Sequence, residues 1–266
     1  MNHFVTRMIH RLSMLAVAVV TAGRVFGQEF NLPRHPLVGQ HFEPPQVIWN
    51  HPIYTNSFDD ASTLKDWQLE GGKQMAITNG RLVLESPPGA KTPADNTGHL
   101  VCWLRKEIPG DFLLEFSFRP LIRTQGLAIV FFNTRGTNGE SIFDHALRKR
   151  DGTFIQYLRA DLNSYHLSYW AGDRGTAHLR KNYGAYVVAV GDDLIAGAAP
   201  DGFQTVRIYK RGGVIRITVD GIVALAYDDD GKTHGPVWRH SGWIGLRQMS
   251  HAVRCEYDHL VVWPLE

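Results

Sequence analysis

Short runs of β-forming residues, separated by turn signals, fill the chain from residue 56 to its end and limit the fold more than any other feature. Asn79-Gly80 lies between QMAIT and RLVLES, and Pro109-Gly110 lies between HLVCWLRKEI and DFLLEFSFRPL. Both pairs predict turns, because Gly accepts positive φ and Pro fixes φ. Helical periodicity is nearly absent, and only residues 141–152 suggest a short helix or a structured loop. Many short strands without crossover helices predict an all-β protein, either a sandwich or a barrel.

Two kinds of hydrophobic pattern favour two packed sheets. The run GLAIVFF is apolar on both faces of a strand. In DFLLEFSFRP the apolar residues alternate, so we expect Phe112, Leu114, Phe116 and Phe118 to face inward. The polar residues between them would then share the outer face. The two sheets of a jelly roll account for both patterns.

The first residues have the form of a secretory signal peptide. Arg7 and Arg11 precede a short apolar run, and small residues stand before a predicted cut at Gln28. The apolar run is too short to span a bilayer. We therefore expect residues 1–27 to be a signal peptide and the protein to be secreted or periplasmic. A formal net charge of +2 with 13 His creates no strong field, so the sequence predicts neither a nucleic-acid nor a membrane partner.

After the predicted signal peptide, the sequence predicts an extended N-terminal segment followed by one domain. Residues 28–54 are rich in Pro and lack periodicity, which predicts a lead-in lying on the surface of a jelly-roll domain at residues 55–266. Cys102 and Cys255 each lie in a predicted strand, near opposite ends of that domain. In an exported protein they either form a disulfide or remain two buried free thiols.

Several segments resemble one bacterial family. The carriers of the resemblance are NGESIFD, QYLRADLNSYHLSYW, LRKNYG, GWIGLRQM and the closing EYDHLVVW. Together they look like the YesU-like family of unknown function, whose members are concanavalin A-like jelly rolls often associated with polysaccharide utilisation. The resemblance covers roughly residues 55–266. It implies a two-sheet concanavalin A-like jelly-roll sandwich and a carbohydrate context, without a mechanism.

The stretch YHLSYW, read as a strand, separates apolar from polar side chains. Tyr165, Leu167 and Tyr169 form the set suited to a core. The opposite set contains Ser164, His166, Ser168 and Trp170. We predict that His166 faces the concave groove of the sandwich, within one side chain's reach of Arg180. The alternative is a satisfied, partly buried histidine beside a solvated loop.

These residues suggest roles in recognising and cleaving an acidic sugar. His166 and Tyr183 are the candidate acid and base, and Arg180 is the candidate carboxylate clamp. The remaining candidates for substrate binding are Trp170, Ser168, Lys181, Asn163, Glu115, Arg119 and Arg247. The same groups would also suit a lectin-like protein that binds acidic or sulfated sugars.

Other chemistries find little support in the sequence. The Glu-x-Asp-x-x-Glu pattern that retaining glucanases of this superfamily need does not occur, and neither does a Gly-x-Ser-x-Gly elbow. No cofactor is predicted. A structural Ca²⁺ near residues 228–231 is the one metal candidate, although a solvated turn is the more ordinary interpretation of that tract.

Two function classes remain. One is an exported enzyme acting on an acidic polysaccharide, as a polysaccharide lyase or a glycoside hydrolase with His and Tyr acid-base groups and an Arg clamp. The other is a non-catalytic carbohydrate-binding protein. Both take a polysaccharide or an oligosaccharide as partner.

Overall fold

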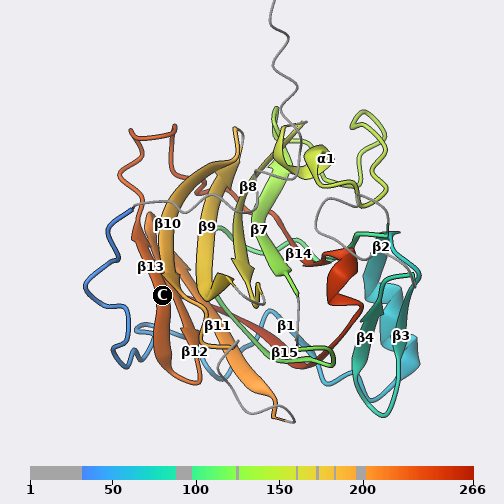
Figure 1. The fold of residues 1–266 in the computed structure, drawn as a ribbon. Coiled ribbons are helices and arrows are strands. Elements are labelled where there is room, and N and C mark those ends of the chain that lie inside the picture. The colour runs from blue at the N-terminus through green and yellow to red at the C-terminus, as the bar shows by residue number, and fades with distance from the viewer. Residues whose placement is uncertain are drawn as a thin grey trace, which may run out of the picture.

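A computed structural model describes residues 32–87, 98–123, 126–159, 161–171, 174–182, 184–195 and 202–266. The predicted signal peptide and the candidate Tyr183 lie outside the described residues. In Figure 1 the strands form two layered sheets, as the all-β prediction requires.

One sheet has eight strands, and every pairing in it is antiparallel. Its order is β13 (Ile222–Asp228), β12 (Val214–Val219), β11 (Gln204–Arg211), β6 (Phe112–Pro120), β15 (Arg254–Pro264), β4 (Leu82–Glu85) and β3 (Gln74–Ile77), with β1 (Tyr54–Asn56) also pairing with β15. The β3–β4 hairpin turns at Asn79 and Gly80, both with positive φ (52° and 68°), as the Asn-Gly signal predicts.

The other sheet has seven strands, again all antiparallel. Its order is β10 (Tyr186–Asp192), β9 (Thr176–Asn182), β8 (Leu162–Tyr169), β7 (Ala128–Gly136), β14 (Trp243–Gln248), β5 (Leu100–Leu104) and β2 (Trp67–Gly71). The helical elements include α1 (Ile155–Leu158) and the 3₁₀ turns Ala61–Asp66 and Ser250–Ala252. Residues 141–152 form a structured loop, the second of the two alternatives that the sequence left open.

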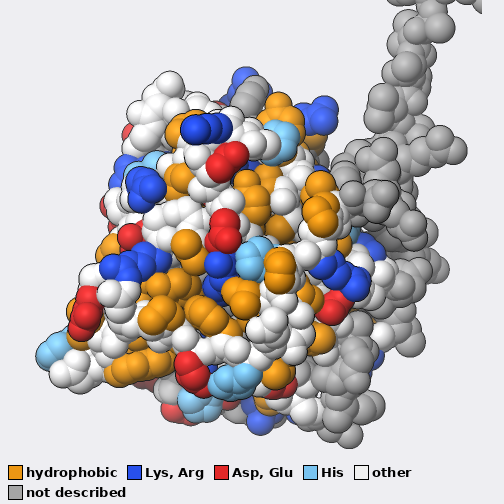
Figure 2. All heavy atoms as spheres, turned by 90° about the vertical axis from the view of Figure 1, so that its left-hand side faces the viewer, with side chains coloured by type: hydrophobic (Ala, Val, Ile, Leu, Met, Phe, Trp, Pro, Cys, Tyr) orange, Lys and Arg blue, Asp and Glu red, His pale blue; other side chains and the backbone are white. Residues whose placement is uncertain are grey.

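The main core lies between the two sheets. Phe112, Leu114, Phe116 and Phe118 of β6 are at most 1% exposed and face it, which confirms the predicted alternation. Tyr165, Leu167 and Tyr169 of β8 face the same core. Along one side of the molecule the edge strands β10 and β13 lie against each other. A Cβ at Gly191 would meet the carbonyl oxygen of Ala224 at 2.0 Å, so only glycine permits this approach. Figure 2 shows this side, where hydrophobic side chains gather among charged ones.

The two cysteines remain free thiols buried in the core, so the disulfide alternative is wrong. Cys102 belongs to β5 of the seven-stranded sheet and Cys255 to β15 of the eight-stranded sheet. The two strands are therefore not paired with each other. The thiol of Cys102 instead donates to the sulfur of Met75, 3.0 Å away.

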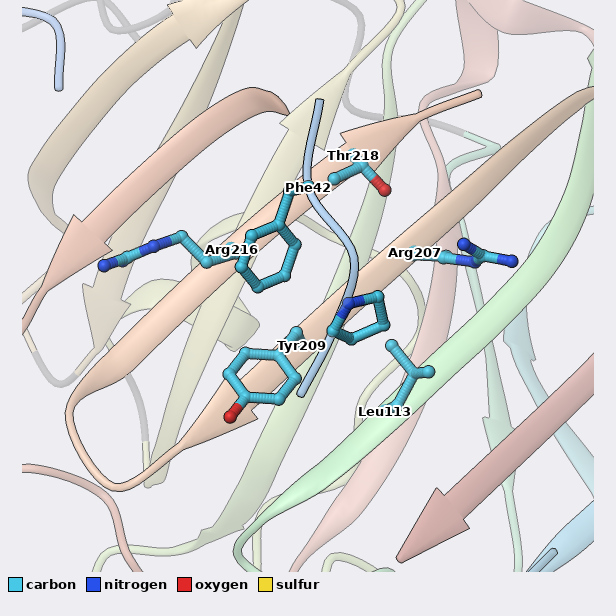
Figure 3. A pocket seen from close by; sticks show the side chains of 7 residues that line it. Phe42, Leu113, Arg207, Tyr209, Arg216 and Thr218 are labelled. Carbon is cyan, nitrogen blue, oxygen red and sulfur yellow. The ribbon is translucent and has the colours of Figure 1, made fainter. Parts of the chain in front are cut away.

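The described part of the lead-in crosses the outer face of the eight-stranded sheet. It forms isolated bridges from His41 to Ile222 and from Val47 to Leu265. Phe42 meets Tyr209 edge to face, with ring centroids 5.6 Å apart. Figure 3 shows the hollow beside this crossing, which is lined by Phe42, Pro44, Leu113, Arg207, Tyr209, Arg216 and Thr218. The lead-in thus covers much of the middle of this face.

Candidate functional site

The outer face of the seven-stranded sheet carries two rows of side chains at right angles to the strands. Residues paired across neighbouring strands share a face, so the register defines each row. The first row contains Val187, Arg180, His166, Phe131, Gly245, Trp103 and Gln68. The second row contains Val190, His178, Ser168, Ile129, Arg247, Val101 and Glu70. His166 therefore lies directly across from Arg180, as predicted.

His166 is nevertheless sealed from solvent. It is 1% exposed, and its ring meets those of Phe131 and Phe154 edge to face, with centroids 5.2 and 6.0 Å away. Its Nδ1 has no hydrogen-bond partner. Burial, followed by the nearby charges of Arg180 and Arg247, holds the pKa of His166 well below its usual value. The expectation of an accessible groove histidine is wrong, because another part of the chain covers this part of the sheet.

Residues 141–158, which we call the cover segment, form that covering layer. Their apolar side chains build a second core on the outer face of the sheet, consisting with its sheet partners of Val101, Trp103, Leu127, Ile129, Phe131, Ile142, Leu147, Phe154, Tyr157, Leu158, Leu162, Trp243 and Met249. The backbone lies close to β2 as well, since a Cβ at Gly71 would meet the carbonyl oxygen of Asp151 at 2.2 Å. The sandwich therefore has three layers over β7, β14 and β5.

Polar contacts anchor the cover segment to the sheet. The carboxylate of Glu70 accepts hydrogen bonds from Arg150 (2.8 and 3.1 Å) and from the hydroxyl of Tyr157 (2.8 Å). Arg247 is fully buried and donates through Nη2 to the carbonyl oxygen of Gly152, 2.8 Å away. Its guanidinium lies 5.1 and 4.8 Å from the ring centroids of Phe154 and Tyr157. Arg247, a predicted substrate-binding residue, thus lies on the same face of the sheet as Ser168, beneath the cover segment.

A cationic cluster lies on the part of this face toward β9. Arg174 donates to the hydroxyl of Ser168 (3.2 Å), and Arg180 donates to the carbonyl oxygen of Ala185 (2.9 Å). Burial lowers the pKa of Arg174 to about 10, and burial together with the charge of Arg174 lowers the pKa of Arg180 to about 10. Burial, Arg174 and Arg180 lower the pKa of His178 to about 3, so its imidazole is neutral at neutral pH. We call Arg174, His178, Arg180 and Ser168 the arginine cluster.

Two candidates lie on the inner side of the sheet. Lys181 adjoins Arg180 in β9 and therefore points to the opposite face, where its Nζ contacts the buried Asp229 at 2.7 Å. Trp170 follows β8 with a positive φ of 47°, which breaks the alternation after Tyr169. Its indole is 1% exposed and packs in the main core, where Gly126 leaves room for the ring. The expectation that Trp170 shares the face of His166 is wrong, and the predicted substrate-binding residue Lys181 does not lie on that face either.

Glu115 and Arg119 belong to the other sheet. Both are in β6, on the outer face of the eight-stranded sheet. Glu115 accepts from Arg207 at 2.5 Å, and Arg119 donates through Nε to Glu256 at 2.9 Å. Because the whole sandwich separates them from His166, they do not contribute to the same site. Asn163 is half-buried at the beginning of β8, where it pairs in register with Arg135, at the other end of the strand from Ser168.

The carboxylates of the aspartate tract that suggested Ca²⁺ contact other groups of the protein. Asp228 contacts Arg216 at 2.7 Å, and Asp229 accepts from Lys181 and from the hydroxyl of Tyr165. Asp230 accepts from the backbone amides of Lys232 and Thr233, which lower its pKa to about 2. The three carboxylates therefore point to different donors. In the described ranges, no three His, Cys, Asp or Glu side chains are gathered as a metal site requires.

Sequence reasoning missed Trp103, Arg174, Tyr157 and Glu70. The alternation in HLVCWLRKEI could have placed Trp103 on the outer face once Cys102 was assigned to the core. No local signal identifies Tyr157 or Glu70, because their meeting depends on a contact between segments 87 residues apart.

Among the residues described, no helix is long and apolar enough to cross a membrane.

Comparisons with known proteins agree on family and fold. A family model for a domain of unknown function, DUF1961, matches residues 51–262. The uncharacterized protein YesU of Bacillus subtilis (strain 168) is 34% identical over 205 residues, covering 74% of this chain and 89% of YesU. A crystal structure from Bacillus subtilis, of a protein of unknown function with a galectin-like fold, is 32% identical, with a TM-score of 0.71 over 80% of this chain and 95% of that one.

More distant structures share the fold and include carbohydrate-related proteins. SCLam, a non-specific endo-β-1,3(4)-glucanase of family GH16, has a TM-score of 0.56 at 13% identity, over 86% of this chain and 97% of its own. The carbohydrate-binding module CBM66 from Bacillus subtilis has a TM-score of 0.50 at 13% identity, over 75% and 96%. At such identities the likeness shows the jelly-roll fold alone. The match over most of the domain shows more: the chain belongs to the DUF1961 family of YesU-like proteins, within the concanavalin A-like superfamily.

Proposed function

We propose that the protein binds a carboxylate-bearing polysaccharide on the outer face of its seven-stranded sheet. The observation that carries this proposal is the arginine cluster, in which Arg174 donates to the hydroxyl of Ser168 on β8 and Arg180 lies on the same face of the neighbouring strand β9. Two guanidinium groups held together in a partly desolvated place favour an anion, because each donates charge-assisted hydrogen bonds. The glucanase and the carbohydrate-binding module that share the fold support a saccharide as the bearer of that anion.

The experiment is a titration of the purified protein with oligogalacturonides, followed by calorimetry. We expect binding to the acidic oligomer and none to a neutral β-glucan oligomer of equal length. Arg180→Gln should weaken binding at least about tenfold, since it removes a charge-assisted contact. Arg207→Gln is the matched control, because it removes the same charge from the opposite sheet. Equal affinity of wild type and Arg180→Gln would refute the proposal.

A polysaccharide lyase is the second candidate, favoured by the neutral His178 two residues from Arg180 on the same strand face. In β-elimination a base removes the C5 proton of a uronic acid, the C4–O bond breaks, a C4=C5 double bond forms, and the leaving oxygen takes a proton. A low pKa makes His178 a weak base, so the binding function remains our first choice.

One measurement separates the two functions. A lyase produces unsaturated ends whose ultraviolet absorbance rises with time, and His178→Gln should abolish that rise. A protein that only binds gives no absorbance change while the calorimetric signal persists.

Export belongs to the same proposal. Residues 1–27 would direct secretion and be removed, which would bring the protein to an extracellular or periplasmic polysaccharide. N-terminal sequencing of protein recovered outside the cytoplasm should begin at or near Gln28. Recovery of residues 1–20 in that material would contradict export by this route.

A further inference from the structure

The outer face of the seven-stranded sheet continues beyond the arginine cluster, beneath the cover segment, with side chains that a plain apolar core would not use. Arg247 is fully buried there, and its Nε and Nη1 have no hydrogen-bond partner. The indole nitrogen of Trp103 and Nδ1 of His166 also lack partners. Each unsatisfied buried polar group carries a substantial desolvation cost, greatest for a charged one. A functional role is one of the explanations for a buried polar group without a partner.

The cover segment contacts these groups in the way a sugar acid would. The ring of Tyr157 lies over those of Phe131 and Trp103, with centroids 5.7 and 6.4 Å away and interplanar angles of 28° and 32°. The carbonyl oxygen of Gly152 accepts the one hydrogen bond that Arg247 donates to an oxygen. A bound uronic acid would make the same two contacts. Its ring would lie on the aromatic pair, and an oxygen of its carboxylate would accept from the guanidinium.

We infer that Trp103 and Arg247 form a second uronic-acid subsite, which the cover segment occupies until an acidic glycan displaces it. With Gly152 moved away, Nη2 of Arg247 joins Nε in the fork that matches a carboxylate. A carboxylate is a stronger acceptor than the neutral carbonyl it replaces, so Arg247 gains a stronger hydrogen-bond partner in the exchange. The inference rests on the proposed function, because one acidic polysaccharide would contact both Arg180 and Arg247. It would run along the two rows of side chains on the outer face of the seven-stranded sheet.

The strength of the anchor sets the cost of opening. Glu70 holds Arg150 and Tyr157, and both side chains belong to the cover segment. Weakening that anchor raises the population of the open form, and the apparent affinity of a ligand rises with that population. If the cover is purely structural, loss of Arg150 lowers stability but leaves affinity unchanged, so affinity separates the two interpretations.

The experiment measures oligogalacturonide affinity for four proteins. Arg150→Ala should bind about three- to tenfold more tightly than wild type. Arg247→Gln should bind at least about tenfold more weakly. Lys149→Ala, an exposed cation of the same segment, is the matched control and should bind as wild type does.

Hydrogen exchange of the unaltered protein gives a readout that needs no variant to fold. Amides of residues 151–158 should lose protection when the oligomer is added. If Arg180→Gln loses binding while Arg247→Gln and Arg150→Ala keep wild-type affinity and exchange at 151–158 is unchanged, this inference is overturned and the proposed function stands. If the wild type binds no acidic oligomer, both are wrong.

Discussion

At the scale of single residues, burial determines what each histidine of the outer face can do. His166 and His178 are 1% and 4% exposed, and both have pKa values far below the ordinary one. Neither carries charge at neutral pH. His166 therefore acts first as a packing residue between Phe131 and Phe154, and a catalytic role would require the cover segment to open.

Replacing His166 by Ala should lower the free energy of unfolding by about 2 kcal/mol or more, because it leaves a cavity between two aromatic rings. Urea denaturation measures this change. His259→Ala is the control: its side chain is 72% exposed, so we expect a change within about 0.5 kcal/mol. A loss below about 1 kcal/mol for His166→Ala would show an accessible histidine and would contradict its packing between Phe131 and Phe154.

The low pKa of His166 also predicts how stability depends on pH. Below the unfolded pKa of about 6.5, the unfolded chain binds a proton at this residue that the folded chain does not bind. Stability is therefore complete above about pH 6.5 and falls as the pH decreases toward the folded pKa, by up to about 1.4 kcal/mol per pH unit for this histidine.

His166→Leu removes that titration and an unsatisfied nitrogen while keeping most of the volume. Its plot of unfolding free energy against pH should be shallower than that of the wild type by about 1.4 kcal/mol per unit well below pH 6.5. Identical slopes for the two proteins would mean that His166 titrates normally in the folded state.

At the scale of elements, adjacent residues of β9 serve opposite sides of the sheet. Arg180 faces outward, whereas Lys181 faces the inner side and joins Asp229 in an ion pair with both side chains 0% exposed. Lys181 also donates to the carbonyl oxygen of Gly235 (2.7 Å), and Tyr165 donates to Asp229 (2.5 Å). This pair fixes the loop after β13 against β8 and β9.

Lys181→Met should destabilise the protein by about 3–5 kcal/mol, because the carboxylate of Asp229 would remain buried without its cation. Thermal and urea unfolding measure the loss. Adding Asp229→Asn should recover part of it, and Lys232→Met, an exposed lysine of the same loop, should change little. If Lys181→Met were as stable as the wild type, the pair would not hold the loop.

At the scale of the whole molecule, the two sheets bury both thiols between them. Burial raises the pKa of both Cys102 and Cys255, so little reactive thiolate forms. The native protein should react slowly with a thiol reagent, and two thiols should become reactive on unfolding without a reductant. An intact mass that rises by two hydrogens on reduction would instead reveal a disulfide.

The sequence by itself determined the fold class and the face on which many side chains lie. Alternation in a strand is a local property, because successive Cβ atoms point to opposite sides. It correctly placed Phe116 in the core and His166 on the face of its sheet that points away from the core. It misplaced Trp170 because a positive φ ended the alternation. Tertiary structure alone decided that β6 lies in the other sheet from β8 and that residues 141–158 cover His166 and Arg247. The physical reason is that a strand's pattern defines a face, whereas exposure of that face depends on segments distant in the sequence.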